Sequence, residues 1–276
     1  MNIMQAWVIG NWKQQPATLQ AVDELLDSVI KRLPNGDVPL CNTMVIPCHV
    51  HLPAANSKLT NTSVALGAQD ICAFSAETGA FTGDCSAAQV RDAGADWVLV
   101  GHSERRQYYG EDNDILLKKL RNALSQQLGV IFCIGETKAQ YDSEQTLQVL
   151  EDQLSVIQRI ISEHASESNN EANLAERLII AYEPVWAIGT GKVPTVEEVT
   201  ATHSHIKQVI KQYAGAAGEL DNLCVLYGGS VNADNAAIFA QADSVDGALV
   251  GGASLNAESF LAIAEAFSAA KASNVQ

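Results

Sequence analysis

Short runs of apolar residues, rich in Val, Ile and Leu, recur along the whole chain. An uninterrupted run of this kind is typical of a strand buried on both faces, as the strands of parallel sheets are. The pattern predicts eight strands, at 6–10, 43–47, 63–67, 97–101, 130–134, 178–182, 223–227 and 246–250.

Helical periodicity fills the longer segments between these runs. In 17–33 and 146–161 apolar residues recur every three or four positions and form one stripe, and 196–213 repeats this less strictly. Short strands alternating with long helices predict βαβ units and a parallel sheet. Eight units favour a closed (β/α)8 barrel, with an open doubly wound sheet as the alternative. No domain boundary is visible, so we expect residues 1–276 to form a single α/β barrel domain.

Two segments interrupt the alternation. Residues 68–86 form a long connection rich in Gly and small residues, and a connection of that length is usually functional. Residues 166–176 are polar and are expected to be a solvated insertion before the sixth strand. Neither this insertion nor the tail after about residue 268 suggests a role.

Composition and charge narrow the classes of partner. Hydrophobic residues make up 47% of the chain and charged residues 18%, which suits a large core and excludes a disordered chain. The formal net charge of −15 disfavours nucleic acid and anionic membranes, and no apolar run has the length of a membrane span. A phosphate-bearing substrate would require a local positive site against this charge.

The six cysteines form neither a CxxC pair nor the spacing of a disulfide framework. The first residues, MNIMQ, show no basic region followed by an apolar stretch. We therefore expect a cytoplasmic protein.

Residues directly after the strands are the candidates for chemistry, because the active site of such a barrel lies at the carboxyl ends of its strands. Reading those positions gives one cation, one imidazole, carboxylates and two glycine pairs: Asn11, Lys13, His102, Ser103, Glu104, Glu183, Gly228, Gly229, Ser230, Gly251 and Gly252. These side chains are predicted to meet at one mouth of the barrel.

The glycine pairs follow the seventh and eighth strands, Gly228-Gly229 before Ser230 and Gly251-Gly252 before Ala253. Glycine lets the backbone approach a ligand, and free N–H groups at helix starts bind phosphate without a formal charge. Phosphate sites of such barrels lie after these two strands. The alternative is that both pairs are only tight turns.

Glu183 ends the sixth strand and is followed by Pro184, which restricts the residue before it. The next residues, VWAIGTGK at 185–192, are an apolar tip between a proline and two glycines. This pattern predicts a lid that closes and excludes water, with an apolar surface loop as the alternative.

His102 precedes a predicted helix start, where the dipole disfavours a second proton on the ring. Lys13 follows the first strand, where a solvated lysine is not expected. A structural histidine and a surface lysine are the alternatives. His49 and His51 form an HxH pair, but no further ligands occupy the matching strand ends, so we expect no metal.

Motifs at nearly every strand end resemble those of the triosephosphate isomerase family, in that family's order. They are GNWK (10–13), GAQD (67–70), TGAFTGD (78–84), VGHSERR (100–106), CIGET (133–137), YEPVWAIGTGK (182–192), YGGSV (227–231) and LVGGASL (249–255). The combination of YEPVWAIGTGK with GHSERR is highly specific. The resemblance implies a TIM barrel that interconverts dihydroxyacetone phosphate and D-glyceraldehyde 3-phosphate in glycolysis and gluconeogenesis. Because proton transfer alone moves the carbonyl in that reaction, we expect no cofactor.

The same resemblance implies roles for individual residues. Glu183 would abstract the proton from C1, and a neutral His102 would polarise the carbonyl and shuttle protons. Lys13 would stabilise negative charge, Asn11 would add a hydrogen bond, and Glu104 would support Lys13. The substrate's phosphate would be held by four further residues: Gly189, Ser230, Gly251 and Gly252.

A homodimer is also implied, in which the connection 68–86 docks beside the partner's active site. Thr82 would then lie near Asn11 and Lys13 of the partner subunit. Asp84 stands where the family commonly has Glu, which bears on the strength of this interface.

Two other functions are consistent with a phosphate-binding barrel. One is an enzyme for a larger sugar phosphate or an indole precursor, which would need a wider mouth than the complete lid motif allows. The other is a non-catalytic barrel, which predicts the loss of Lys13, His102 or Glu183. All three residues are present.

Overall fold

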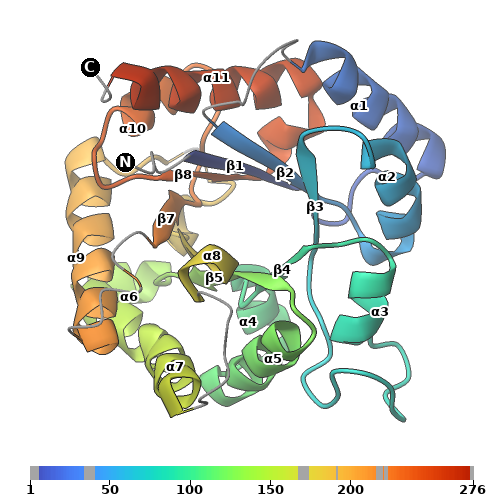
Figure 1. Cartoon of the computed structure of the whole chain (residues 1–276). Helices are drawn as coiled ribbons and strands as arrows, with labels where there is room; N and C mark the ends of the chain where they lie inside the picture. The colour runs from blue at the N-terminus through green and yellow to red at the C-terminus, as the bar shows by residue number, and fades with distance from the viewer. Residues whose placement is uncertain are drawn as a thin grey trace.

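The computed structural model describes residues 6–33, 41–166, 174–190, 192–215, 220 and 223–273. Eight parallel strands pair in sequence order, and β1 pairs with β8 to close the barrel. Helices surround the strands (Figure 1). The (β/α)8 barrel is therefore confirmed, and the pairing of β1 with β8 rules out an open doubly wound sheet. That one domain takes in all of residues 1–276 stays a prediction.

The ends of the strands lie within two residues of the predicted runs. They are β1 (Ala6–Asn11), β2 (Cys41–Ile46), β3 (Val64–Ala68), β4 (Trp97–Val100), β5 (Gly129–Ile134), β6 (Leu178–Tyr182), β7 (Cys224–Tyr227) and β8 (Gly247–Val250).

The helices include the three that were predicted from periodicity. They are α1 (Leu19–Arg32), α2 (Leu52–Leu59), α3 (Ala87–Asp92), α4 (Ser103–Tyr109), α5 (Asn113–Ser125), α6 (Lys138–Asp142), α7 (Thr146–Ser166), α8 (Leu174–Arg177), α9 (Val196–Ala214), α10 (Ala236–Ala240) and α11 (Ala257–Ser273). Short 3-10 helices also occur in the described ranges, namely η1 (His49–His51), η2 (Val185–Ala187) and η4 (Gly252–Leu255).

The strands read as continuous apolar runs because each contributes to two apolar layers. In β1, Ile9 belongs to the cluster inside the barrel, with Leu99 of β4 and Ile179 of β6. Its neighbour Val8 belongs to the layer between strands and helices, with Leu26 of α1. Both faces of each strand are thereby buried, as the sequence pattern predicts.

The connection between β3 and α3 extends away from the barrel without a helix or strand across residues 71–86 (Figure 1). The insertion predicted at 166–176 lies largely outside the described residues, since 167–173 are not among them. Its last residues form α8, Leu174–Arg177. The supposed tail after residue 268 is the end of α11, which runs to Ser273. No helix in these described ranges is long and apolar enough to cross a membrane.

Acid stability should depend on His203 of α9. Its ring is fully buried against the edge of Tyr182, with centroids 5.8 Å apart, and no described residue accepts from or donates to its Nε2. Burial and the nearby Lys207 charge lower the pKa of His203 from 6.5 to about 3, against two backbone hydrogen bonds that raise it. Its contribution to stability is therefore fully present above pH 6.5 and is lost as the pH falls toward 3.

We expect this one group to reduce the free energy of unfolding by about 2 to 3 kcal/mol between pH 7 and pH 4.5. The free energy of unfolding, measured with urea at both pH values, should therefore fall by about 2 to 3 kcal/mol less in His203→Gln than in the wild type. His205→Gln is the matched control, because His205 is partly exposed on the same helix and pairs with Glu151 at 3.0 Å. An equal loss in wild type and His203→Gln would contradict the assignment.

Candidate active site

A cavity of about 350 Å³ opens at the carboxyl ends of the strands. Its lining includes every residue predicted to catalyse the reaction or to hold phosphate: Asn11, Lys13, His102, Glu183, Gly189, Ser230, Gly251 and Gly252. Elements far apart in the sequence bring these residues together, as the strand-end rule predicts. Their individual roles stay predictions.

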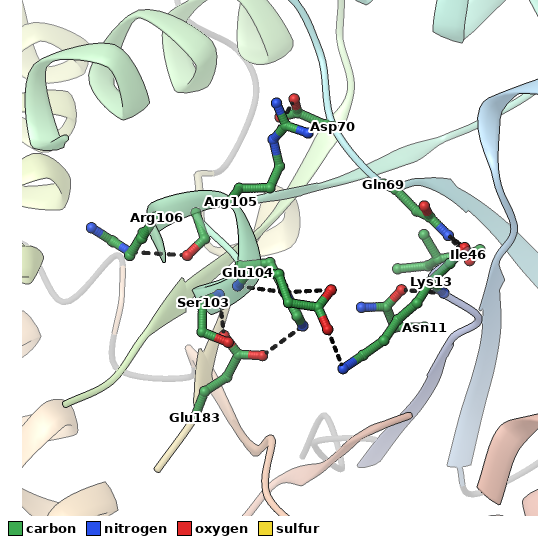
Figure 2. A network of polar contacts seen from close by, with 12 residues as sticks. Asn11, Lys13, Ile46, Gln69, Asp70, Ser103, Glu104, Arg105, Arg106 and Glu183 are labelled. Atoms are coloured by element: carbon green, nitrogen blue, oxygen red, sulfur yellow. Dashed lines mark hydrogen bonds and ion pairs between the residues drawn. The ribbon is translucent and has the colours of Figure 1, made fainter. Parts of the chain in front are cut away.

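Glu183 follows β6 directly and is 2% exposed. Its backbone N–H donates to the Ile134 carbonyl at 2.7 Å, which fixes the residue beside the end of β5. Its Oε1 lies 3.0 Å from His102 Nε2. Its Oε2 accepts from the Ser103 N–H at 3.0 Å (Figure 2). Burial raises the pKa of Glu183, but the His102 ring, the Ser103 N–H and the Lys13 charge together hold it below the ordinary carboxyl value. The group is therefore a buried carboxylate.

His102 caps the N-terminus of α4. Its Nδ1 accepts from the Glu104 N–H at 3.2 Å, so the ring proton lies on Nε2, which faces Glu183. Burial lowers the pKa of His102, but the adjacent Glu183 carboxylate outweighs it and the net shift is upward. The upward shift therefore depends on the contact between these two side chains.

Lys13 has a left-handed backbone, with φ of 53°. Two contacts hold it there: its N–H donates to Asn11 Oδ1 at 3.0 Å, and its carbonyl accepts from Gln69 Nε2 at 2.6 Å. The Nζ donates to Glu104 Oε1 at 2.7 Å (Figure 2). The unusual backbone directs the ammonium into the cavity beside Gly251, where the Lys13 Cε would lie 3.8 Å from an added Cβ.

The opposite wall of the cavity is backbone. A Cβ added at Gly252 would meet nothing within 4 Å, so the peptide groups there are open to a ligand. In the part of the chain that the structure describes, the N–H groups of Gly252 and Ser230 have no acceptor. After β7 the Asn232 side chain accepts from two backbone N–H groups in the turn that leads into α10. This wall can bind an anion without a cationic side chain.

The predicted lid has a fixed beginning and an exposed tip. Its first residues form η2, where Trp186 Nε1 donates to Glu136 Oε1 at 2.7 Å and the Trp186 ring lies 4.3 Å from that of Tyr141. Ala187 is buried, and its carbonyl accepts from Ser230 Oγ at 2.9 Å. The tip from Gly189 is exposed. Gly191 lies outside the described residues.

Sequence reasoning missed two residues that hold this site in place, Glu136 and Arg106, and the backbone role of a third, the strand-end candidate Ser103. Glu136, fully buried two residues past β5, receives Trp186, and the strand-end rule applied to β5 would have found it. Ser103 acts through its backbone N–H, which no residue pattern reveals. Arg106 binds two carbonyl groups behind the site.

The remaining candidates lie outside the cavity. Thr82 is exposed on the connection between β3 and α3. His49 Nε2 lies 2.7 Å from the Asp70 carbonyl and His51 is buried. Within the described ranges, no group of three or more His, Cys, Asp or Glu side chains could hold a metal ion.

Comparisons with known proteins agree with these motifs. A family model described as triosephosphate isomerase matches residues 6–267. The triosephosphate isomerase of Psychrobacter arcticus is 58% identical over 271 residues, covering 96% of this chain and 98% of that protein. The same enzyme of Psychrobacter cryohalolentis is 58% identical, over 97% and 99% of the two chains. That of Coxiella burnetii is 40% identical, over 94% and 95%.

Proposed function

The chain belongs to the triosephosphate isomerase family, which interconverts dihydroxyacetone phosphate and D-glyceraldehyde 3-phosphate, and we propose that it does so in the cavity at the strand ends. The observation that carries this proposal is the buried Glu183 carboxylate, which touches the His102 Nε2–H at the edge of a cavity with an anion-binding wall. Isomerisation needs a base, a group that donates a proton to oxygen, and a phosphate-binding site. The three are adjacent here.

In the proposed reaction, Glu183 takes a proton from C1 of dihydroxyacetone phosphate. The released electron pair forms the C1–C2 double bond, and negative charge develops on the C2 oxygen. His102 donates its Nε2 proton to that oxygen and recovers a proton from the C1 oxygen. Glu183 then returns its proton to C2, so no cofactor is required.

The neutral state proposed for His102 follows from the same contacts. Its pKa is raised mainly by the adjacent Glu183 carboxylate, with a smaller upward contribution from the Glu104 charge. Once Glu183 has taken the substrate's proton, burial, the Lys13 charge and the N-terminus of α4 favour the neutral ring, against the Glu104 charge. A neutral histidine can donate to an oxygen of rising basicity. A neutral histidine beneath a closing loop is already the established pattern of this enzyme family, and the proposal extends that pattern to His102.

Charge stabilisation is assigned to Lys13, with a hydrogen bond from Asn11. The protein carries a formal net charge of −15, so a local cation is needed to attract a phosphate ester. Glu104 binds Lys13 Nζ at 2.7 Å and keeps it directed at the cavity. We propose that the phosphate itself lies against four residues: Gly189, Ser230, Gly251 and Gly252.

The segment after Pro184 is proposed as a lid that protects the intermediate. An enediolate that carries a phosphate can expel it, and a closed, dry site prevents this side reaction.

We expect deletion of 188–190 to raise inorganic phosphate release per turnover at least about tenfold. A tenfold change requires the barrier to phosphate loss to fall by only about 1.4 kcal/mol relative to the barrier to isomerisation. Phosphate release and isomerisation would be measured in the same sample. Release at the wild-type rate per turnover would contradict the protective role.

A homodimer is proposed from the aromatic residues around the site. Phe74 and Phe81 stack with centroids 5.4 Å apart and are 61% and 39% exposed on the β3–α3 connection. Tyr108 and Tyr109, 72% and 69% exposed, border a second cavity of about 570 Å³ beside Lys13. Such exposed aromatic groups are typical of interfaces, and the connection that bears Thr82 could fill that cavity in a partner subunit.

Sedimentation should give twice the chain mass for the wild type. Phe74→Glu should shift the population toward monomer and lower activity in parallel, because a charge cannot be buried there without a partner. Lys118→Glu near the same ring is the charge control. A wild type that sediments as a monomer at assay concentration would exclude the dimer.

The metabolic setting follows from the substrates, which belong to glycolysis and gluconeogenesis. A cytoplasmic location is proposed because all six cysteines are free thiols, as a reducing compartment requires. Cell fractionation with an enzyme assay tests it, and activity confined to an oxidising compartment would exclude it.

A further inference from the structure

Arg106 on α4 is half-buried behind the proposed active site, and all of its hydrogen-bond acceptors are neutral. Its Nε donates to the Gly101 carbonyl at 2.9 Å, its Nη2 to the Cys133 carbonyl at 3.1 Å and its Nη1 to Asn113 Oδ1 at 3.3 Å. Among the described residues, no carboxylate lies within ion-pair distance of this guanidinium. Its positive charge is therefore not neutralised locally.

The neighbouring arginine shows what an ordinary arrangement would be. Arg105 lies one position earlier in α4, and its Nε lies 2.8 Å from Asp70 and 2.7 Å from Glu111 (Figure 2 shows Asp70). Burial lowers the pKa of Arg106, whereas in Arg105 the two carboxylates outweigh burial and raise it. A partly buried cation without a counter-ion is unfavourable for stability, and such a charge beside an active site points to a functional role.

The acceptors of Arg106 lie where two strands end. The parallel ladder between β4 and β5 ends at the pair Val100 and Phe132, and the chain turns at Gly101 with φ of 79°. Arg106 then joins the Gly101 and Cys133 carbonyls, one residue past the ladder on each strand. The peptide that it holds leads directly into His102.

Charged and titratable groups surround both Arg106 and the base. The groups that act on Arg106 are Cys133, Glu183, Glu111 and Asp152. Those that act on Glu183 from its other sides are His102, Lys13 and the Ser103 N–H. Burial raises the pKa of the Cys133 thiol well above its usual value, and the Glu183 charge raises it further, so this thiol stays neutral. Lys13 thus lowers the pKa of Glu183, and Arg106 is a second cation whose charge interacts with Glu183.

We propose that Arg106 is a positioning residue for the isomerisation: its guanidinium holds the Gly101–His102 peptide and the first turn of α4 against Glu183, and its unneutralised charge keeps the base ionised. Arginine donates to the two carbonyls from two nitrogen atoms held in one rigid plane, whereas a lysine has a single ammonium nitrogen on a flexible stem. This inference rests on the proposed function of Glu183 as base.

The first test is a carbon-13 NMR titration of the Glu183 carboxyl group in the ligand-free enzyme, labelled on glutamate side chains. Its signal is identified by its absence in Glu183→Gln. Arg106→Gln should raise the pKa of Glu183 by about one unit, the shift expected when a charge is removed from a half-buried site. Arg106→Lys keeps the charge and should shift it by less than about 0.3 unit.

Arg105→Gln is the matched control, with the same substitution at the next position of α4. Because the Arg105 charge is already neutralised by Asp70 and Glu111, its loss should leave the pKa of Glu183 within about 0.3 unit of wild type. An unshifted Glu183 in Arg106→Gln, or equal shifts in Arg106→Gln and Arg106→Lys, would overturn the electrostatic role.

Steady-state kinetics test the positioning role. Arg106→Lys should lower kcat about tenfold with KM within about twofold, because the fork is lost while substrate contacts remain. A wild-type kcat in Arg106→Lys would overturn positioning, and this variant decides the matter if Arg106→Gln does not fold. Full activity in Glu183→Gln would instead overturn the base assignment, so the two failures are distinguishable.

Discussion

Glu183→Gln should lower kcat for isomerisation of glyceraldehyde 3-phosphate by about three orders of magnitude, within the range found for loss of a general base. The amide has the shape of the carboxylate, and its oxygen can still accept from the Ser103 N–H that Glu183 Oε2 now binds at 3.0 Å. It cannot take a proton from carbon. A coupled assay of wild type and variant in parallel measures the difference.

Binding provides the control for this variant. We expect a phosphoglycolate-like inhibitor to bind at the wall around Gly252, so its affinity should fall much less than kcat does. Glu183→Asp, with the base withdrawn by one methylene, should also bind this inhibitor while losing most of kcat. Unchanged kcat in either variant would remove Glu183 from its assigned role.

The fold could be predicted because one physical constraint acts on every strand. Burial on both faces gives continuous apolar runs, so Val8 and Ile9 are both apolar although they face different layers. Helix ends were harder to place. The stripe of α7 ends near Ile161 and the helix continues to Ser166 through polar residues, which carry no periodic signal.

Some residues of the candidate site could also be predicted from the sequence, and others could not. Glu183, His102 and Lys13 stand at strand ends, where topology alone makes a residue suspect. Glu104 was expected from the resemblance as a support for Lys13, but other supports were not predictable, because they are backbone groups such as the Gly101 and Cys133 carbonyls, which any residue supplies. The protonation state of His102 also depends on a contact with a residue from another strand, which spacing within one motif does not encode.

Lys13→Met should weaken binding of a phosphoglycolate-like inhibitor by about a hundredfold, as expected when a hydrogen bond from a charged group worth about 1.5 to 3 kcal/mol is removed. Methionine has nearly the same length and keeps the apolar stem in place. Lys13 is the only lysine or arginine among the described residues that line the cavity. Isothermal titration at low and high salt measures the effect.

Lys58→Met is the matched control for this prediction. Lys58 on α2 is 29% exposed and pairs with Asp27 at 2.7 Å, while Lys13 is also 29% exposed and pairs with Glu104 at 2.7 Å. The two substitutions remove the same charge from the same net-negative protein, but only Lys13 faces the cavity. Affinity should therefore fall in Lys13→Met alone. Equal affinities in both variants would mean that the phosphate is held by the glycine-rich wall without this cation, or at another site.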